Sequence, residues 1–599
     1  MSRVWTCVFL LLGMASQAMA LDAVLRINED PYYTQYKASK WPGASLKKFY
    51  APLPVFAEGW ASTPREGIVN YKWDYGDGTP EMWGTMNGAH VYEKPGTYWL
   101  KLVVYDAYGN KDYQNTRIDV LAPNGITYYV DSAIGSDSND GKSMTRPWKT
   151  ATKAFTGINS TRYKPGDRVL FKRGQTFEVL AGEVHPASFY SGYGYSFGAY
   201  GTGAKPIIQK VGTSTAPIIK IGMTGMAHFA MMDLEFRTTS KEGVPSGEVY
   251  AGTCQSFNLL FLRIDVRNMR RAFGFSGDYT GRRINGVFVV ECNMENSGDT
   301  MIYARAARFA MLNNYLDLSN DHLVYTSYMD KALYWGNTFK RPAFGRVCLR
   351  ISGATNYLNP TNNVAIVNNY FEGWIDPQTV GAAHNGGGTR YNFLLLDIGP
   401  NVRSTQAIEH IEVAQNTLKN GECFLSMGVA HNVKVHDNLF TTVDLNAHAQ
   451  RITVGHQYEI RPMRNVKIYD NVIISNEQRT RFAGVFVVRW YDPKYPYQGQ
   501  VYHTGVEIEN NQIQLTNCNG APVVWIENSN SAQVKEVRSD YNTIYSNCDD
   551  DIFLLGGHYW SGPIIGINEW REKTGNDVNS QVVASKINLA ELTLDVPTK

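Results

Sequence analysis

The sequence predicts an all-β chain in which a small antiparallel β-sandwich precedes a long parallel β-solenoid, and three observations support this prediction. A short phrase built around an Asn returns through the second half of the chain, at intervals of 22 to 47 residues. Each copy follows a strand rich in β-branched residues, such as VAIV, VKVH, VKIY or VEIE. Residues 46–120 instead show strands separated by Asp-Gly and Pro-Gly turns, the pattern of a sandwich. The copies are NNYL (313–316), GNTF (336–339), NNYF (368–371), QNTL (415–418), DNLF (437–440), DNVI (470–473), NNQI (510–513) and YNTI (541–544).

The repeat predicts a solenoid because strands stacked in parallel at about 4.8 Å place like residues directly above one another. An Asn at the corner of each coil tolerates left-handed backbone geometry, and its amide can bond the Asn above and below. In the earlier coils, Asp233, Asp265 and Asn293 are expected at the same ladder position. The variable spacing fits loops of different length on one side of the solenoid.

This asparagine ladder resembles the right-handed parallel β-helix of the secreted pectate-lyase-like polysaccharide lyase superfamily. The resemblance covers about residues 126 to 580. The β-helix domain, with an N-terminal cap and a C-terminal helical tail that begins at residues 566–580, is expected to span residues 126–599. It implies ten or more coils and an exported protein that acts on a polysaccharide. The architecture does not name the polysaccharide.

The sandwich resembles a PKD-type immunoglobulin-like domain. The stretches that carry the resemblance are WDYGDGT (73–79), HVY (90–92), KPGTY (94–98) and the alternating strand WLKLVVYD (99–106). With a lead-in, the domain is expected to span residues 21–121, and residues 122–125 form a linker to the solenoid. The resemblance implies a spacer or contact module rather than a catalytic domain.

Residues 1–20 have the three parts of a secretory signal peptide. Arg3 supplies the positive charge, residues 4–12 are apolar, and Ala18-Met19-Ala20 is a small-residue cleavage site. No later stretch is long and apolar enough to span a bilayer. The protein is expected to be secreted or periplasmic in a bacterium, with no membrane attachment after signal cleavage.

The composition narrows the class of partner. A net charge of +2 offers no excess of positive charge for nucleic acid or an anionic membrane. The 37 Tyr and 13 Trp residues are a plentiful source of rings on which sugars stack. The expected partner is therefore an acidic polysaccharide, bound by a monomer through local Arg and Lys residues.

Metal ions and disulfides are not required by the sequence. Six Cys follow the signal peptide, and none has the CxxC spacing of a zinc site. Cys518 and Cys548 lie one coil apart and are the best disulfide candidates, with simple burial as the alternative. The run DSNDG (137–141) suggests Ca2+ as a possible cofactor, but it is one residue short of an EF-hand loop. A structural turn in the N-terminal cap is the preferred interpretation.

Candidate catalytic residues lie on a second set of strands between the ladder turns. Alternation requires the residue between two core positions to point outward, as Arg350 does between Leu349 and Ile351. A Tyr, an Arg and an Asp in successive coils predict a cleft. Aligned on their apolar residues, these strands give the outward column Tyr303, Tyr325, Arg350, Asp397, Ser426, Arg489 and Trp525.

The chemistry expected on this column is β-elimination of a uronate polymer. The reaction needs a group that neutralises the C5 carboxylate, a base for the C5 proton and a donor to the leaving oxygen. Arg350 suits the first role, because a guanidinium forks a carboxylate and stays charged. The remaining catalytic candidates are Tyr325, Tyr328, Lys331, His322 and Asp397. The candidates for substrate binding are Tyr303, Arg305, His384, Arg390, Arg489, Trp490 and Trp525, of which His384 and Arg390 lie in a Gly-rich insertion.

Residues 321–371 also resemble the alginate-lyase type of β-helix. The matching parts are NTF (337–339), an Arg on the next strand (Arg350) and NNYF (368–371). Where that family carries its base Lys, this chain has Tyr328, with Lys331 three residues on. The base and the polymer therefore stay open.

Two other functions fit the same pattern. A glycoside hydrolase would use Asp397 with a second carboxylate about 5–10 Å away; the possible sources of that carboxylate are Asp299, Asp321, Glu422 and Asp444. A non-catalytic polysaccharide-binding or matrix protein would show aromatic stripes without a convergent base. C5 epimerisation shares the proton abstraction of a lyase and is not separated from it.

Each candidate also has a purely structural interpretation. Arg350 and Asp397 would form a surface ion pair, and His322 would cap a turn. Tyr303 and Tyr325 would be ordinary stacked surface aromatics.

Overall fold

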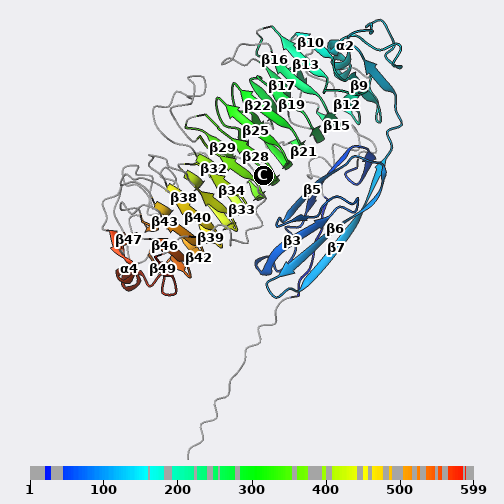
Figure 1. The fold of residues 1–599 in the computed structure, drawn as a ribbon. Helices are drawn as coiled ribbons and strands as arrows, with labels where there is room; N and C mark the ends of the chain where they lie inside the picture. Colours follow the sequence, from blue (N-terminus) through cyan, green and yellow to red (C-terminus); the bar gives the residue numbers. More distant parts are fainter. Residues whose placement is uncertain are drawn as a thin grey trace, which may run out of the picture.

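A computed structural model shows that the chain folds into a sandwich packed alongside a long solenoid (Figure 1). The all-β prediction, with a parallel β-helix preceded by a small sandwich, is confirmed. The structure describes residues 20–27, 45–159, 162–180, 192–212, 214–221, 225–238, 247–253, 256–276, 284–343, 345–353, 361–374, 394–399, 408–421, 423–441, 450–455, 462–475, 484–488, 503–515, 522–526, 534–546, 551–555, 564–584 and 587. The predicted signal peptide lies outside the described residues, apart from Ala20.

Each coil contributes one strand to each of three sheets, and the strands of successive coils pair in parallel. The 15-stranded sheet consists of β8 (Thr127–Val130), β9 (Arg168–Lys172), β12 (Ser196–Tyr200), β15 (Met226–Met232), β18 (Phe257–Leu262), β21 (Ile284–Val290), β24 (Ala306–Leu312), β27 (Asp330–Trp335), β30 (Asn362–Val367), β33 (Ile408–Ala414), β36 (Ala430–His436), β39 (Arg464–Tyr469), β42 (Thr504–Glu509) and β45 (Val537–Asp540), with β11 (Gly192–Tyr193) paired to β15.

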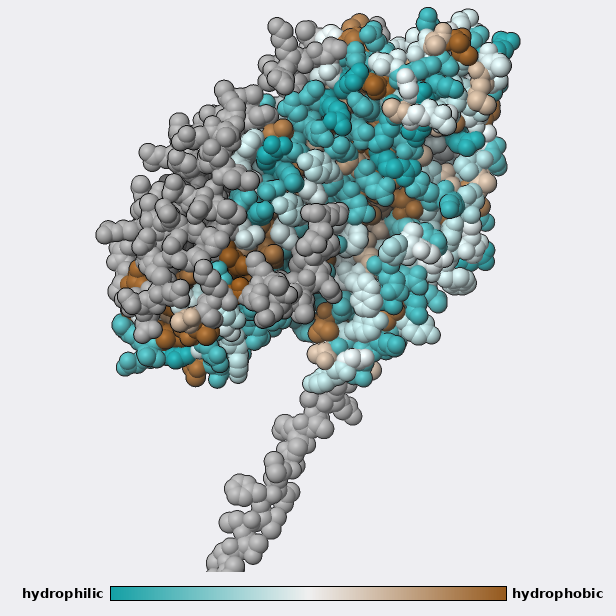
Figure 2. Space-filling view, viewed as in Figure 1, coloured by the Kyte–Doolittle hydropathy of each residue, from teal (hydrophilic) through white to brown (hydrophobic). Residues whose placement is uncertain are grey.

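The 14-stranded sheet follows the ladder corner of each coil. Its strands are β10 (Thr176–Leu180), β13 (Ile207–Val211), β16 (Glu235–Thr238), β19 (Asp265–Arg267), β22 (Asn293–Ser297), β25 (Tyr315–Ser319), β28 (Thr338–Lys340), β31 (Tyr370–Glu372), β34 (Thr417–Lys419), β37 (Leu439–Thr441), β40 (Val472–Ser475), β43 (Gln512–Leu515), β46 (Thr543–Ser546) and β49 (Gln581–Val583). Its outward face is hydrophilic around β19, β22 and β25 (Figure 2).

The 13-stranded sheet closes the coil and carries the predicted column. Its strands are β14 (Ile219–Ile221), β17 (Glu248–Thr253), β20 (Arg271–Ser276), β23 (Ile302–Ala304), β26 (Val324–Ser327), β29 (Val347–Ser352), β32 (Leu394–Ile398), β35 (Cys423–Met427), β38 (Gln450–Val454), β41 (Gly484–Val488), β44 (Val524–Ile526) and β47 (Asp551–Leu555), which ends in an antiparallel pair with β48 (Ile564–Gly566).

The interior of the solenoid is filled by columns of like side chains. On the 14-stranded sheet, one inward column contains Leu316, Phe339, Phe371, Leu418 and Phe440, all fully buried. The rings of Phe339 and Phe371 stack with centroids 4.8 Å apart, which is the spacing of neighbouring strands. Apolar burial of this kind is the main source of stability of the solenoid.

The asparagine ladder forms the corner between the 15- and 14-stranded sheets. Each ladder amide donates through Nδ2 to Oδ1 of the next, at 2.8 to 3.0 Å. The residue before each ladder Asn takes a left-handed φ between 54° and 68°. The sequence pattern assigned the left-handed geometry and the ladder hydrogen bonds to one Asn. In the structure, the residue before the Asn takes the left-handed geometry, and the Asn itself forms the hydrogen bonds. The ladder residues are Asn314, Asn337, Asn369, Asn416, Asn438, Asn471, Asn511 and Asn542.

The predicted ladder residues of the earlier coils are wrong. Asp233 occupies the left-handed corner with φ 57°, and Asp265 and Asn293 begin strands of the 14-stranded sheet. The ladder position is filled there by the buried residues Leu234, Ile264 and Cys292. The ladder ends at Cys292, whose backbone N–H donates to Oδ1 of Asn314.

Both ends of the solenoid are closed by a helix. At the N-terminal end, Asp137 accepts from the backbone N–H groups of Lys149 and Thr150 next to α2 (Ala151–Thr156), so the DSNDG run includes a structural turn. At the other end, α4 (Ile567–Thr574) buries Trp570, whose Nε1–H donates to Asp577. The predicted cap and helical tail are both present.

The sandwich pairs a five-stranded sheet with a two-stranded one. The first contains β1 (Lys48–Tyr50), β7 (Lys111–Leu121), β6 (Gly96–Asp106), β3 (Ile68–Asp74) and β4 (Met82–Trp83), and the second contains β2 (Leu53–Glu58) and β5 (Asn87–Tyr92). A 3-10 turn, η1 (Arg65–Gly67), precedes β3. The two-stranded sheet contacts the solenoid.

The sandwich packs against apolar residues on the outer face of the 15-stranded sheet. Side chains that point away from the solenoid interior form one core with the sandwich, in place of the polar residues expected on a solvated face. The solenoid residues in this core are Ala230, Leu260, Leu262, Phe288, Val290, Ala310, Leu312, Leu333, Ala365, Val367 and Ala414. The two domains are therefore packed as one body.

Polar contacts fix the orientation of the sandwich. Arg308 Nε donates to Oε1 of Glu58 at 2.8 Å, and neither side chain is more than 6% exposed. The Nδ2 group of Asn87 donates to the carbonyls of Ala332 and Asn363. At the exposed rim, Arg263 forms a two-pronged pair with Glu93.

The remaining sequence predictions about the chain are tested only in part. Cys292 and Cys348 are buried thiols, and burial raises the pKa of both. Cys518 and Cys548 lie outside the described residues. In the described part of the chain, no helix has the length and apolar character to cross a membrane.

We expect Asn416→Ala to lower the free energy of unfolding by about 3 kcal/mol, because it removes buried donors and acceptors. Asn416 donates to Asn438 and to the carbonyl of Ile366, and it accepts from Asn369. Urea unfolding followed by circular dichroism measures the change. The neighbouring Thr417→Ala, on a half-exposed position, is the control and should change stability by less than about 0.5 kcal/mol. Equal stability of the two variants would contradict the ladder's role.

We expect Glu58→Gln to loosen the docked sandwich, because it leaves the Arg308 guanidinium buried without a counter-charge, a loss of about 3 kcal/mol. Glu93→Gln makes the same substitution at the rim, where an exposed pair contributes about 1 kcal/mol or less. Protease cleavage at the linker and the radius of gyration from X-ray scattering report the effect. An intact, compact Glu58→Gln protein would show that apolar burial alone holds the interface.

Candidate functional site

The strand register places four of the predicted residues in one outward column. Tyr303 pairs with Tyr325, Tyr325 with Arg350, and Arg350 with Asp397 on successive strands of the 13-stranded sheet. The column continues through Ser426, as predicted, and then through Thr453, Val487 and Trp525. The predicted place of Arg489 in the column is wrong, since Val487 occupies it.

Arg350 is the central charge of the column. Its guanidinium carbon lies 5.6 Å from the ring centroid of Tyr325, and its Nε lies 3.4 Å from Oδ2 of Asp397. The second contact is a charge pairing without hydrogen-bond geometry, because Nε is buried and has no hydrogen-bond partner. Among the described residues, none hydrogen-bonds to the terminal nitrogens of Arg350, and the side chain is 28% exposed. The fork of the guanidinium is thus available to a carboxylate.

Asp397 forms the floor of the column. Its residue exposure is 7%, and burial raises the pKa of its carboxyl, while Arg350 and a hydrogen bond from Ser426 oppose that rise. A carboxyl of this kind is a proton holder as well as a counter-charge.

A second Arg and two Tyr rings lie beside Arg350. The Arg305 guanidinium carbon is 5.3 Å from the centroids of both Tyr303 and Tyr328, and Arg305 Nε donates to Oγ of Ser327 at 3.3 Å. Tyr303 stacks on Tyr325 with centroids 5.6 Å apart. Burial raises the pKa of Tyr303, and Arg305 opposes that shift. The two Arg–Tyr pairs form a compact polar surface.

His322 has a structural position at the edge of this surface. Its Nδ1 accepts from the backbone N–H of Val347 at 3.0 Å, so the neutral ring carries its proton on Nε2. Burial lowers its pKa to about 4, Asp321 opposes this, and Arg350 and Arg346 add to it. A ring whose accepting nitrogen is already engaged is a poor base, which favours the turn-capping interpretation.

Two predicted site residues point elsewhere. Lys331 lies on β27 in the 15-stranded sheet, pairs with Asp330 at 2.7 Å and faces the ring of Trp60, which follows β2 of the sandwich, so it does not share a cleft with Arg350. Trp525 shares the column but is 1% exposed and packs with Val487 and Leu554, so it is a packing residue rather than a stacking platform. Its partners on the two adjacent strands, Val487 and Leu554, are both apolar.

Several predicted residues lie outside the described part of the chain. They are His384, Arg390, Arg489 and Trp490, together with the possible second carboxylates Glu422 and Asp444.

Arg271 is a neighbour of the column that the sequence pattern did not indicate. Its guanidinium carbon lies 5.9 Å from the Tyr303 centroid, and its terminal nitrogens pair with Glu248 and Asp299 at 3.0 and 2.8 Å. The Arg270-Arg271 dipeptide at the start of a strand, one coil before Asp299, was the available signal. Because Asp299 is held by both arginines, it is not an unpaired carboxylate.

The described residues contain no group of three or more His, Cys, Asp or Glu side chains arranged to hold a metal ion. The described residues therefore give no support to Ca2+ as a cofactor.

Comparisons with known proteins identify the first domain. Residues 52–120 match the family model of the PKD domain, and the sandwich is therefore a PKD domain. Lacto-N-biosidase from Bifidobacterium longum subsp. longum is 31% identical over 110 residues, which are 18% of this chain and 7% of that enzyme. The chain thus matches less than a tenth of the length of this curated relative.

Three solved structures are similar to the chain at low identity. The A-module of mannuronan C-5 epimerase AlgE6 from Azotobacter vinelandii is 12% identical, covers 69% of this chain and 89% of its own, and has a TM-score of 0.39. The family 28 exopolygalacturonase of Yersinia enterocolitica is 10% identical, with coverages of 89% and 97% and a TM-score of 0.33. The PL6 family alginate lyase AlyGC is 11% identical, with coverages of 72% and 56% and a TM-score of 0.35. The strand pairing described above establishes the parallel β-helix independently of these likenesses.

Proposed function

We propose that the protein is a polysaccharide lyase that cleaves an acidic, uronate-containing polymer by β-elimination on the 13-stranded sheet. One observation carries the proposal. The guanidinium of Arg350 lies between the Tyr325 ring and the Asp397 carboxylate in adjacent coils, and its terminal nitrogens have no partner among the described residues. A purely structural ion pair would be expected to use those nitrogens on Asp397.

The proposed division of roles follows from this arrangement. Arg350 binds the uronate carboxylate and stabilises the negative charge that develops when the C5 proton leaves. Tyr325, in contact with Arg350, is the proposed base. Asp397 holds Arg350 in place by charge while it is ionised. Its raised pKa makes it the proposed proton donor to the leaving oxygen in the protonated form, once the uronate carboxylate has replaced it as the partner of Arg350.

Neighbouring side chains extend the surface to the next sugar unit. Tyr303 stacks on Tyr325, and Arg305 lies between Tyr303 and Tyr328. We propose that these residues bind the adjoining uronate by stacking and by charge. Lys331 and His322 have no part in this assignment.

A glycoside hydrolase is the second candidate, and the burial of Asp397 favours it. A buried carboxyl with a raised pKa is the acid that hydrolysis needs. Asp321 lies on a coil about 10 Å away, at two strand spacings, but Arg346 and Thr300 already bind it at 2.7 and 2.8 Å. In the described part of the chain, the column places Arg350 and Ser426 beside Asp397, and no second carboxylate.

We expect Arg350→Ala to lower kcat on a uronate polymer by about a hundredfold or more, because a charge-stabilising group of the transition state is lost. Arg350→Lys keeps the charge but loses the fork, and should have an intermediate rate. The ultraviolet absorbance of the unsaturated product, followed across pectate, alginate and other acidic polysaccharides, measures the rate. Arg267→Ala, which removes the same charge from the 14-stranded sheet, is the control. Full activity of Arg350→Ala would overturn the proposed site.

We expect Tyr325→Phe to lower kcat while leaving KM within about twofold, because the ring that contacts Arg350 remains and only the hydroxyl is lost. Reducing-end formation without ultraviolet absorbance, abolished by Asp397→Asn, would instead establish the hydrolase. Retention on immobilised polysaccharide with neither product would identify a binding protein.

A further inference from the structure

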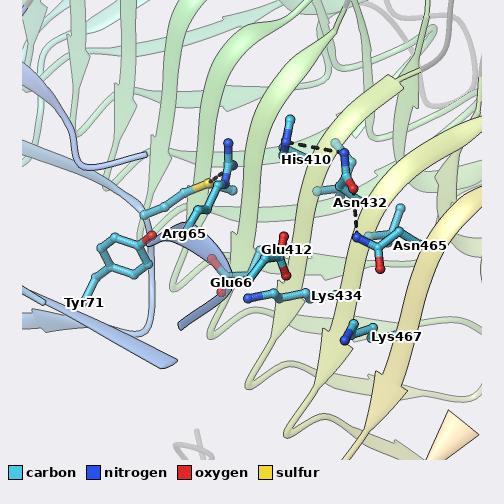
Figure 3. Close-up of a pocket in the computed structure, with 12 residues that line it drawn as sticks. Arg65, Glu66, Tyr71, His410, Glu412, Asn432, Lys434, Asn465 and Lys467 are labelled. Carbon is cyan, nitrogen blue, oxygen red and sulfur yellow. Dashed lines mark hydrogen bonds between the residues drawn. The ribbon is translucent and has the colours of Figure 1, made fainter. Parts of the chain in front are cut away.

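A crevice lies where the PKD domain ends on the 15-stranded sheet, on a different sheet from the proposed active site. It contains about 490 Å³ of space, open solvent included, and it lies at a domain interface, where ligand sites are common. Residues of η1 and β3 form one wall, and residues of β33, β36 and β39 form the other (Figure 3). Only the docked arrangement of the two domains creates it.

The outward residues of the sheet change character at this point. Under the PKD domain one register column reads Leu260, Phe288, Ala310, Leu333 and Ala365, all buried and apolar. From β33 onward the same column reads Glu412, Lys434, Lys467, Glu507 and Arg538. The crevice lies at this change, so its floor is charged while its back is closed by the interface.

A second column adds amides to the floor. His410, Asn432 and Asn465 each take a left-handed φ, and Asn465 Nδ2 donates to Oδ1 of Asn432 at 2.8 Å. Arg308 and Asn363, which contact the PKD domain, have equivalent left-handed positions in earlier coils. The positions that bind the PKD domain in one half of the sheet thus line an open crevice in the other.

Two cations of the crevice form no ion pair with a carboxylate in the part of the chain that the structure describes. Arg65 donates to Oδ1 of Asn363 and to the sulfur of Met86, and burial lowers its pKa. Lys434, half-exposed on β36, has no ion pair with any residue that the structure describes. Lys467 differs, since Glu507 lies 3.1 Å away. Glu66 and Glu412 lie near Arg65 without pairing with it, and an anionic ligand would supply the direct ion pair that both cations lack among the described residues.

The crevice also presents acceptors for hydroxyl groups. Glu412 directs Oε1 toward His436 at 3.5 Å, whereas its Oε2 is buried and has no hydrogen-bond partner. Burial opposes the charge of His436, but the contacts with Asp437 and Glu412 outweigh it and raise its pKa to about 9. Glu412 thus offers one oxygen that no described residue hydrogen-bonds, and Glu66 lies on the facing wall.

We propose that this crevice is a second carbohydrate site that binds a carboxylated sugar unit, with the carboxylate at Arg65 and Lys434 and the ring hydroxyls at Glu412, Asn432 and Asn465. A neutral sugar would form no direct ion pair with either cation, and a simple anion would leave the acceptors unused. The proposal takes its ligand class from the proposed function. Because the crevice and the Arg350 column lie on different sheets, the site anchors a long polymer and does not take part in bond cleavage.

Binding to a catalytically inactive protein tests the proposal. Isothermal titration calorimetry with galacturonate and mannuronate oligosaccharides, and with maltohexaose as a neutral probe, is performed on full-length Arg350→Ala. The same titrations are repeated after adding Lys434→Ala or, as the matched control, Lys419→Ala, which removes a half-buried lysine from β34 on the 14-stranded sheet.

We expect Lys434→Ala to weaken uronate binding about tenfold or more, since one charge-assisted contact is lost, and Lys419→Ala to leave it unchanged. With the active protein, Lys434→Ala should raise KM for long polymer without changing kcat, and should not affect short oligosaccharides. Three results would each overturn the proposed crevice site. They are equal uronate affinity of the two lysine variants, maltohexaose binding as tight as uronate binding, and no uronate binding to Arg350→Ala.

The two proposals fail separately. If the wild-type protein binds uronates through Lys434 but forms no unsaturated product, the crevice proposal stands and the lyase proposal is wrong. If unsaturated product is formed and neither KM nor binding affinity changes in Lys434→Ala, the lyase proposal stands and the crevice proposal is wrong.

Discussion

Coil-to-coil register is the constraint on which the structure depends, and the asparagine ladder enforces it. Each ladder amide is buried and uses its hydrogen-bonding groups on the coils before and after it, so a slip by one residue would leave several of them unsatisfied in a dry interior. The same slip would turn the inward Leu and Phe columns outward. Once register is held at this corner, the short strands of the other two sheets follow, and side chains far apart in sequence stand one strand spacing apart. Arg350 and Asp397, 47 residues apart, meet for this reason.

The architecture could be predicted from the sequence because the ladder requires the same short motif in every coil, with alternating apolar residues on both sides of it. The register at Arg350 was also accessible, since a charged residue between Leu349 and Ile351 has only one acceptable orientation. Alternation loses this power where both faces of a strand are apolar. In β41 (Gly484–Val488), every candidate for the outward position is small or apolar, so the nearby charge of Arg489 was mistaken for the marker. In the first coils, Leu234 and Ile264 replace the ladder amide, so no Asn marks the ladder position there.

The docking of the PKD domain explains the other discrepancies. Strands such as β18 and β24 are buried on both faces, which is the signature of a covered sheet, but a sequence does not say what covers it. Lys331 was therefore assigned to the cleft from its closeness in sequence to Tyr328, although it turns toward Trp60. Arg65, Glu412 and Lys434 come from segments more than 300 residues apart, and only the assembled interface brings them together.

The change from an apolar to a charged outer column at β33 divides the solenoid into two parts with different freedom to vary. Coils up to β33 are matched to the footprint of the PKD domain, so adding or removing one there would misalign Glu58 from Arg308 and break a shared core. In the described part of the chain, the strands after β33 pair only with strands of neighbouring coils, and a solenoid of that kind lengthens or shortens by whole repeats at little cost. Relatives of this chain should therefore differ in length mainly at the far end of the solenoid, and the reach of the polymer-binding surface can change there without altering how the PKD domain is held.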